Sequence, residues 1–207
     1  MKALGSKYHG DKNIVSKCDH LLYYIPNFLG QLSDSYYDHC ARLDNWQQRQ
    51  IYLFGRWSKI PRLTLWYSVS GEPYTYSGIT MTAQPYPPVI KKISNQVTKF
   101  SGQHFNSVLL NRYRNGSDKI GWHSDNEKCL GEIINIATIS LGAKRHLLTK
   151  RPGDKKSVEL ELEHGSLLLM KHPFQHKWLH CIPPRKLQND ERISLTFRTI
   201  VTAQDST

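Results

Sequence analysis

The chain of 207 residues lacks several features that define whole classes of protein. It contains no run of about eighteen apolar residues, so the sequence predicts no transmembrane helix. Residues 1–7 include no apolar stretch of the kind that a secretory signal peptide needs. Only four cysteines are present, and none is spaced as C-x-x-C, which argues against a zinc ribbon or a dithiol redox motif. We therefore expect free thiols in a reducing intracellular compartment, the nucleus in a eukaryote or the cytoplasm in a bacterium.

Acidic residues are scarce relative to basic ones. The chain has 28 lysines and arginines against 17 aspartates and glutamates, a formal net charge of +11. Such a balance favours a polyanionic partner, nucleic acid first and an acidic membrane second. Lysine and arginine recur beside aromatic residues rather than along one amphipathic helix, which favours nucleic acid. A soluble basic protein without such a partner is the alternative.

The pattern of the chain changes near residue 105. Before it, the sequence predicts helices over residues 33–43 and 87–102, each with a suitable N-terminal residue and an apolar stripe. After it, several short strands, among them residues 133–141 and 177–181, alternate with turn residues up to residue 201. This order indicates one mainly β domain with flanking helices, built as a sandwich, jelly roll or barrel.

One short stretch combines a histidine and a carboxylate at a spacing suited to metal binding. Residues two apart in an extended segment point to the same face, so His123 and Asp125 would converge on one point. His180 is the best candidate for the third protein ligand. Two histidines and a carboxylate form the facial arrangement suited to non-haem Fe(II) oxygenases. An alternative pairs His176 with His180 at helical spacing, but the glutamate of that motif is missing and the surroundings are strand-like.

The last predicted strand, residues 192–201, has one apolar and one polar face. The apolar face consists of Ile193, Leu195 and Phe197, and the polar face of Arg192, Ser194, Thr196 and Arg198. If the polar face is interior, its two arginines would leave a gap suited to a small dicarboxylate, because carboxylates match the guanidinium fork. An edge strand with solvent-facing arginines is the alternative. Asn111 and Tyr113, which share a face just before the H-x-D pair, favour the interior interpretation.

Aromatic residues recur between residues 50 and 76. Phe54 precedes Gly55 and Arg56, where a hairpin tip is predicted, although local sequence alone favours the usual core position of a phenylalanine. Tyr74 and Tyr76 share one side of a short predicted strand. They would either form the floor of a pocket for a flat ligand or cover one face of a sheet.

Together these residues resemble the AlkB family of Fe(II)- and 2-oxoglutarate-dependent dioxygenases over about residues 23–200. The matching segments are Asn111-Arg112-Tyr113, His123-Ser124-Asp125, His180 and the stretch from Arg192 to Arg198, which is similar to the family signature R-x-N-L-T-F-R. Three more segments look most like the nuclear branch that repairs duplex DNA: Phe54-Gly55-Arg56-Trp57, Pro61-Arg62 and Tyr74-Thr75-Tyr76-Ser77-Gly78.

The resemblance implies a double-stranded β-helix (jelly-roll) core with an N-terminal nucleotide-recognition part. It implies that His123, Asp125 and His180 hold Fe(II), with O2 as the oxidant. It assigns 2-oxoglutarate to Asn111, Tyr113, Arg192, Thr196 and Arg198. The implied regions are a loose arm at 1–20, a nucleotide-recognition lid with supporting helices at 21–104, the dioxygenase core at 105–201 and a tail at 202–207.

The resemblance also implies a substrate site. A flipped base would lie between Tyr76 and His123, with Tyr74 hydrogen-bonding nearby and Glu127 approaching its exocyclic group. Phe54 would fill the gap left in the base stack, the reverse of its locally expected core position. The implied substrate contacts are Phe54, Gly55, Arg56, Arg62, Tyr74, Tyr76, Asn126 and Glu127. The implied reaction is oxidative demethylation of 1-methyladenine and 3-methylcytosine in DNA, with release of formaldehyde, succinate and CO2.

Three positions depart from the family pattern. Ser194 replaces the asparagine of the signature, which alters one expected co-substrate hydrogen bond. Asn126 stands where the duplex branch has an acidic partner for Arg62, and Tyr76 replaces a phenylalanine but keeps its stacking surface. The alternatives are a related dioxygenase acting on RNA or protein, and a non-enzymatic basic jelly roll that binds nucleic acid. We expect a monomer that acts on alkylated DNA, duplex first, or on RNA, without membrane association.

Overall fold

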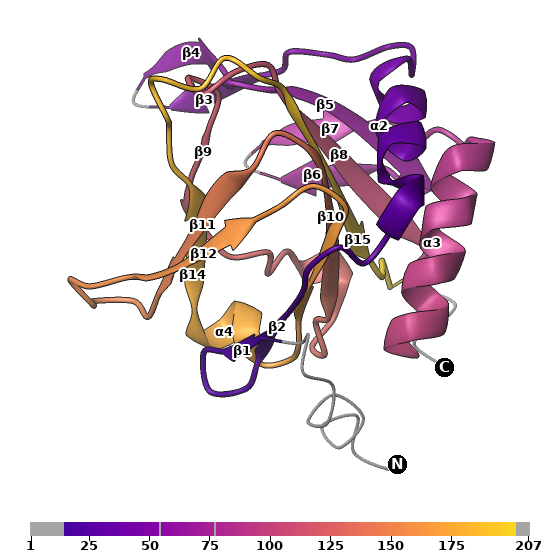
Figure 1. The fold of residues 1–207 in the computed structure, drawn as a ribbon. Coiled ribbons are helices and arrows are strands. Elements are labelled where there is room, and N and C mark those ends of the chain that lie inside the picture. The colour runs from indigo at the N-terminus through magenta and orange to yellow at the C-terminus, as the bar shows by residue number, and fades with distance from the viewer. Residues whose placement is uncertain (1–14, 54, 77, 202–207) are drawn as a thin grey trace.

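The computed structural model describes residues 15–53, 55–76 and 78–201. Two facing β-sheets form the centre of the molecule, and two helices cover the outer side of the larger sheet (Figure 1). This arrangement is the mainly β jelly roll with flanking helices that the sequence predicted. No helix in the described ranges is both long and apolar enough to cross a bilayer.

Within those ranges the larger sheet has seven antiparallel strands and the smaller sheet has four. The larger sheet runs in the order β1 (Val15–Lys17), β2 (Leu22–Ile25), β13 (Ser166–Met170), β10 (Ile136–Gly142), β15 (Arg192–Arg198), β8 (Ser107–Tyr113) and β5 (Leu63–Ser68). The smaller sheet runs in the order β12 (Val158–Leu162), β11 (Arg145–Lys150), β14 (Leu179–Ile182) and β9 (Ile120–His123). Two hairpins stand apart, β3 (Gln50–Leu53) with β4 (Arg56–Lys59) and β6 (Tyr74–Tyr76) with β7 (Ile79–Met81). Two short 3-10 helices are η1 (Gly30–Leu32) and η2 (Lys128–Leu130).

The larger sheet has a different environment on each face because side chains alternate along its strands. On β15, Ile193, Leu195 and Phe197 belong to the apolar core shared with helices α2 (Ser33–Ala41) and α3 (Pro88–Ser101). The residues between them line a cavity that reaches the smaller sheet. One strand therefore supplies both the packed core and the polar interior of the molecule.

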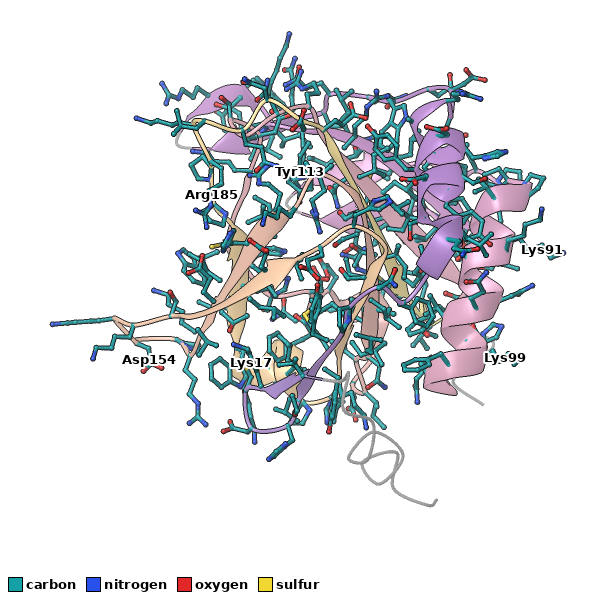
Figure 2. The ribbon with its side chains drawn as sticks, in the orientation of Figure 1. Lys17, Lys91, Lys99, Tyr113, Asp154 and Arg185 are labelled. Atoms are coloured by element: carbon teal, nitrogen blue, oxygen red, sulfur yellow. The ribbon has the colours of Figure 1, made fainter. Side chains whose placement is uncertain are left out.

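Helix α3 begins and ends where the sequence predicted. Pro88 lies in the first turn, where its missing N–H would have no helical partner. Gly102 ends the helix in the left-handed conformation at φ +70°, and its N–H donates to the carbonyl of Thr98. Lys91 and Lys99 point away from the sheets, whereas Tyr113 lies between the two sheets (Figure 2).

Several predicted boundaries were wrong. The helix predicted over residues 33–43 ends at Ala41, and the last strand, predicted over residues 192–201, ends at Arg198. Val15–Lys17 was assigned to a loose arm but forms β1, because its backbone pairs with β2. The strand predicted from Ile133 begins at Ile136, since Ile133 lies in an exposed turn. The strand predicted from Lys177 begins at Leu179, because Lys177 ends the short helix α4 (Phe174–Lys177).

Two loops at one end of the smaller sheet contact each other through Gly116. The N–H of Gly116 donates to the carbonyl of Gln188 at 2.7 Å, and the N–H of Arg185 donates to the carbonyl of Gly116 at 2.6 Å. A Cβ at Gly116 would overlap the carbonyl oxygen of Arg185, which is backbone and cannot swing aside. The absence of a side chain is therefore a requirement of this contact.

We expect Gly116→Ala to lower the free energy of unfolding by roughly 1–3 kcal/mol, because the two loops must separate to admit a methyl group. Urea unfolding of the two proteins measures the difference. Gly121→Ala is the matched control, since a Cβ at Gly121 meets nothing within 4 Å. Equal stability of Gly116→Ala and the wild type would contradict the tight contact.

Candidate metal centre and active site

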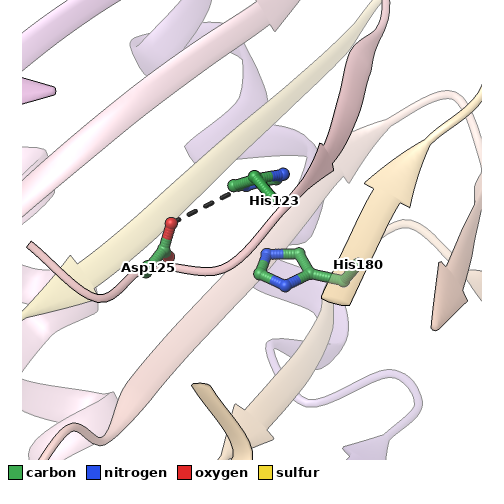
Figure 3. Close-up of side chains that lie close together, drawn as sticks. All are labelled: His123, Asp125 and His180. Carbon is green, nitrogen blue, oxygen red and sulfur yellow. Dashed lines mark ion pairs between the residues drawn. The ribbon is translucent and has the colours of Figure 1, made fainter. Parts of the chain in front are cut away.

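His123, Asp125 and His180 come together at one end of the cavity between the sheets. His123 ends β9, Asp125 follows two residues later, and His180 lies opposite His123 on the neighbouring strand β14. One ligand atom from each residue lies within 4.8 Å of the other two. Figure 3 shows the three side chains converging from two separate segments. Two imidazoles and one carboxylate form a donor set that suits a divalent iron ion.

The protonation states of the two buried ligands also suit a metal. Burial raises the pKa of Asp125, but Arg198 and the two histidines outweigh burial and hold it at about 2. Burial and the neighbouring His123 and Arg198 lower the pKa of His180 to about 3, although Asp125 opposes this shift. At neutral pH Asp125 is a carboxylate and His180 is a neutral imidazole, as metal coordination requires.

Hydrogen bonds orient the ligand atoms. Arg198 Nη2 donates to Asp125 Oδ2 at 2.9 Å, which leaves Oδ1 facing His123 Nε2 at 3.7 Å. His123 Nδ1 lies 2.8 Å from the carbonyl of Gly121 and must donate to it, because a carbonyl only accepts. This bond fixes the tautomer of His123 that keeps Nε2 available as a ligand.

The cavity beside the three ligands has a volume of about 420 Å³. This volume lies in the range of small-molecule sites. Every residue assigned to 2-oxoglutarate from the sequence lines it, namely Asn111, Tyr113, Arg192, Thr196 and Arg198. Ser194, which departs from the signature asparagine, also lines it and is buried.

Two buried arginines, six residues apart on β15, line this cavity. Arg192 and Arg198 are 2% and 4% exposed. Arg192 Nη2 donates to Ser140 Oγ at 2.8 Å, and its guanidinium lies 5.2 Å from the centre of the Tyr113 ring. Nε of both arginines and Nη1 of Arg192 are buried without a hydrogen-bond partner in the described part of the chain. Buried N–H donors of this kind need acceptors, so the cavity fits a dicarboxylate.

The residues assigned to the substrate divide into two groups. Arg62, Tyr74 and Glu127 line the cavity, and burial, with Asp125 nearby, raises the pKa of Glu127. Gly55, Arg56 and Asn126 are exposed and do not line it. Phe54 lies outside the described residues, as does the side chain of Tyr76.

The cavity-lining substrate residues have specific partners. Arg62 Nε donates to Asn111 Oδ1 at 2.8 Å, so this arginine contacts a residue of the co-substrate set. Tyr74 stacks on Trp66 with ring centres 4.6 Å apart, and the guanidinium of Arg198 lies 5.4 Å from its ring. Tyr74 is thereby held close to the candidate metal ligands.

Two buried polar residues next to the cavity were not predicted from the sequence. Arg145, 1% exposed, donates to the carbonyls of Asn115, Asp118 and Pro183 and lies over the Tyr113 ring. A charged residue at an inward position of an alternating strand was the available signal for Arg145. Gln175 accepts the backbone N–H of Asp125, a residue 50 positions away, and no local pattern indicates it.

The comparisons agree with this geometry. A family model described as the 2OG-Fe(II) oxygenase superfamily matches residues 21–198, so the chain belongs to that superfamily. The solved structure titled "The structure of OsALKBH1" covers 86% of this chain and 96% of its own at a TM-score of 0.61 and 19% identity, which supports the fold.

Two curated relatives place the chain more closely within this superfamily. "DNA oxidative demethylase ALKBH2" of Mus musculus is 40% identical over 73% of this chain and 67% of its own length. "Alpha-ketoglutarate-dependent dioxygenase alkB homolog 3" of Bos taurus is 41% identical over 81% of this chain and 62% of its own. Within the superfamily the chain belongs to the AlkB family, which confirms the resemblance of its motifs. The chain spans about three fifths of the bovine and human ALKBH2 proteins, 58% and 61%.

The family therefore identifies Fe(II), 2-oxoglutarate and O2 as the cofactor, co-substrate and oxidant. The residues present fit them. The ionised Asp125 with two histidines matches the iron, and the unpaired donors of Arg192 and Arg198 match the carboxylates.

We expect the metal-free protein to lose stability as the pH falls below about 6.5. The pKa of His180 is depressed by folding, so the unfolded chain binds its proton first. The contribution of neutral His180 to the free energy of unfolding is complete above pH 6.5 and is lost towards pH 3, by up to about 1.4 kcal/mol per pH unit. Urea unfolding in chelator between pH 4.5 and 7 measures it. His180→Asn should flatten the profile, and identical slopes in both proteins would contradict the burial of a neutral His180.

Proposed function

We propose that this chain is a DNA repair dioxygenase that oxidatively demethylates 1-methyladenine and 3-methylcytosine after the base has been flipped out. The observation that carries the proposal is the buried set of His123, Asp125 and His180 beside a cavity lined by Arg192 and Arg198. The names of the ALKBH2 relatives, "DNA oxidative demethylase", support DNA as the substrate. The net charge of +11 favours a polyanion.

Bound Fe(II), with 2-oxoglutarate and O2, would supply the oxidation of the N-methyl group, which would leave as formaldehyde, while 2-oxoglutarate would be converted to succinate and CO2. His123, Asp125 and His180 would hold the metal. Asn111, Tyr113 and Thr196 would orient the co-substrate between Arg192 and Arg198. Because Oδ2 of Asp125 accepts a hydrogen bond from Arg198, the other oxygen, Oδ1, points towards His123.

The methyl group sits on the pairing edge of the base, which is unreachable inside a duplex, so the base must be extruded. Tyr74 and Glu127 line the cavity close to the metal ligands, where they would meet the edge of that base. Tyr76 and His123 are the proposed stacking partners.

The β3–β4 hairpin supports a duplex substrate. Tyr52 and Trp57 are 57% and 67% exposed, with ring centres 5.4 Å apart. In the sequence Phe54 falls between these two strands, and Arg56, the first residue of β4, is exposed. We assign Phe54 the role of a wedge that replaces the extruded base in the stack. We further propose a monomer that works in an intracellular compartment.

Purified protein with Fe(II), ascorbate and 2-oxoglutarate should restore 1-methyladenine or 3-methylcytosine in an oligonucleotide and release succinate. We expect His123→Ala to abolish both, because the metal loses one of three protein ligands. His176→Ala, at an exposed histidine on α4, is the matched control and should repair normally. Full turnover by His123→Ala would reject the metal assignment, and repair of RNA or protein in preference to DNA would favour a related dioxygenase.

Phe54→Ala should lower repair of duplex DNA and spare single-stranded DNA. Stacking of one base on an aromatic ring contributes about 1–3 kcal/mol, which corresponds to a roughly 5- to 150-fold loss in kcat/KM on duplex. Side-by-side repair of one lesion in single- and double-stranded oligonucleotides measures it. Val69→Ala, at an exposed residue outside the hairpin, is the control. An equal loss on both substrates would reject the wedge.

A further inference from the structure

Asp125 lies beyond the end of a strand, so no ladder partner holds its backbone. Strand β9 ends at His123, and residues 124–127 form no regular element. The backbone N–H of Asp125 is instead bound by a side chain from another part of the chain. It donates to Gln175 Oε1 at 2.9 Å, in a buried environment.

Gln175 lies on the short helix α4, which leads directly into the strand that carries His180. The side chain is 2% exposed, and its Nε2 contacts Met170 Sδ at 3.5 Å. Its position is therefore set by packing on both sides of the amide. Helix α4, which leads into the strand of His180, is therefore hydrogen-bonded to the segment that carries Asp125.

We propose that Gln175 is a positioning residue of the metal centre, which fixes the Asp125 backbone relative to His180 before the metal binds and thereby sets metal affinity. The proposal rests on the proposed function only in that His123, Asp125 and His180 are the metal ligands. Arg198 holds the carboxylate of Asp125 and Gln175 holds its main chain, so two bonds define where Oδ1 lies.

The physical reason is the cost of an unpaired buried N–H. Without an acceptor at position 175, the amide of Asp125 would have to turn towards water or remain unsatisfied. Either response displaces the carboxylate from the two imidazoles. Outer-shell groups that orient metal ligands typically change metal affinity by about 10- to 100-fold when they are removed.

The test compares Gln175→Met with Gln175→Glu. Methionine is of similar length but carries no oxygen acceptor, whereas glutamate keeps a carboxyl oxygen at the same place. Mn(II) titration of the metal-free proteins by calorimetry at neutral pH, without nucleic acid or 2-oxoglutarate, measures the affinity. We expect about 10- to 100-fold weaker binding by Gln175→Met, and Gln175→Glu closer to the wild type. His176→Ala, on the same helix but exposed, should bind normally.

Wild-type affinity in Gln175→Met would overturn the proposal. A second measurement on the wild type keeps it testable if that variant does not fold. The amide of Asp125 should be protected from hydrogen exchange in the metal-free protein, and rapid exchange would overturn the proposal equally. Wild-type protein that binds no Mn(II) would overturn the metal centre itself, whereas normal wild-type binding with an unchanged variant overturns only the role of Gln175.

Discussion

The ion pair between Arg198 and Asp125 is the interaction on which the site depends. Both groups are almost fully buried, with Nη2 and Oδ2 2.9 Å apart, and neither charge could be buried alone without a large cost. Arg198 belongs to β15 of the larger sheet, and Asp125 follows β9 of the smaller sheet. The pair therefore joins the two sheets at the point where the candidate metal ligands meet. It also keeps Asp125 ionised in an environment that would otherwise protonate it.

The substrate and co-substrate regions share residues rather than adjoining as separate pockets. Arg62, assigned to the substrate, donates to Asn111 of the co-substrate set. Arg198 contacts a metal ligand and lies over the ring of Tyr74. A side chain that serves two neighbours cannot be changed at one without disturbing the other.

The sequence predicted most of this architecture where the signal is local or periodic. Alternation on β15 predicted its two faces, and proline and glycine predicted both ends of α3, because each of these features arises from neighbouring residues. Converging metal ligands were predicted from the H-x-D spacing together with the family resemblance. Gln175 could not be predicted, since its partner Asp125 lies 50 positions away and becomes a neighbour only after folding. Alternation on β11 marks Arg145 as inward-facing, but its carbonyl partners, such as that of Pro183, could not be predicted for the same reason. The Val15–Lys17 strand was missed for the same reason, as its pairing depends on tertiary context.

The alternation along β15 has a practical consequence for redesign. Odd-numbered positions from Ile193 to Phe197 face the helices, while even-numbered positions from Arg192 to Arg198 face the cavity. A library confined to Ser194 and Thr196 would therefore reshape the cavity between the two arginines and leave the packing of the apolar core untouched. Alternative oxoacids could be screened on such variants without first rebuilding the hydrophobic interior.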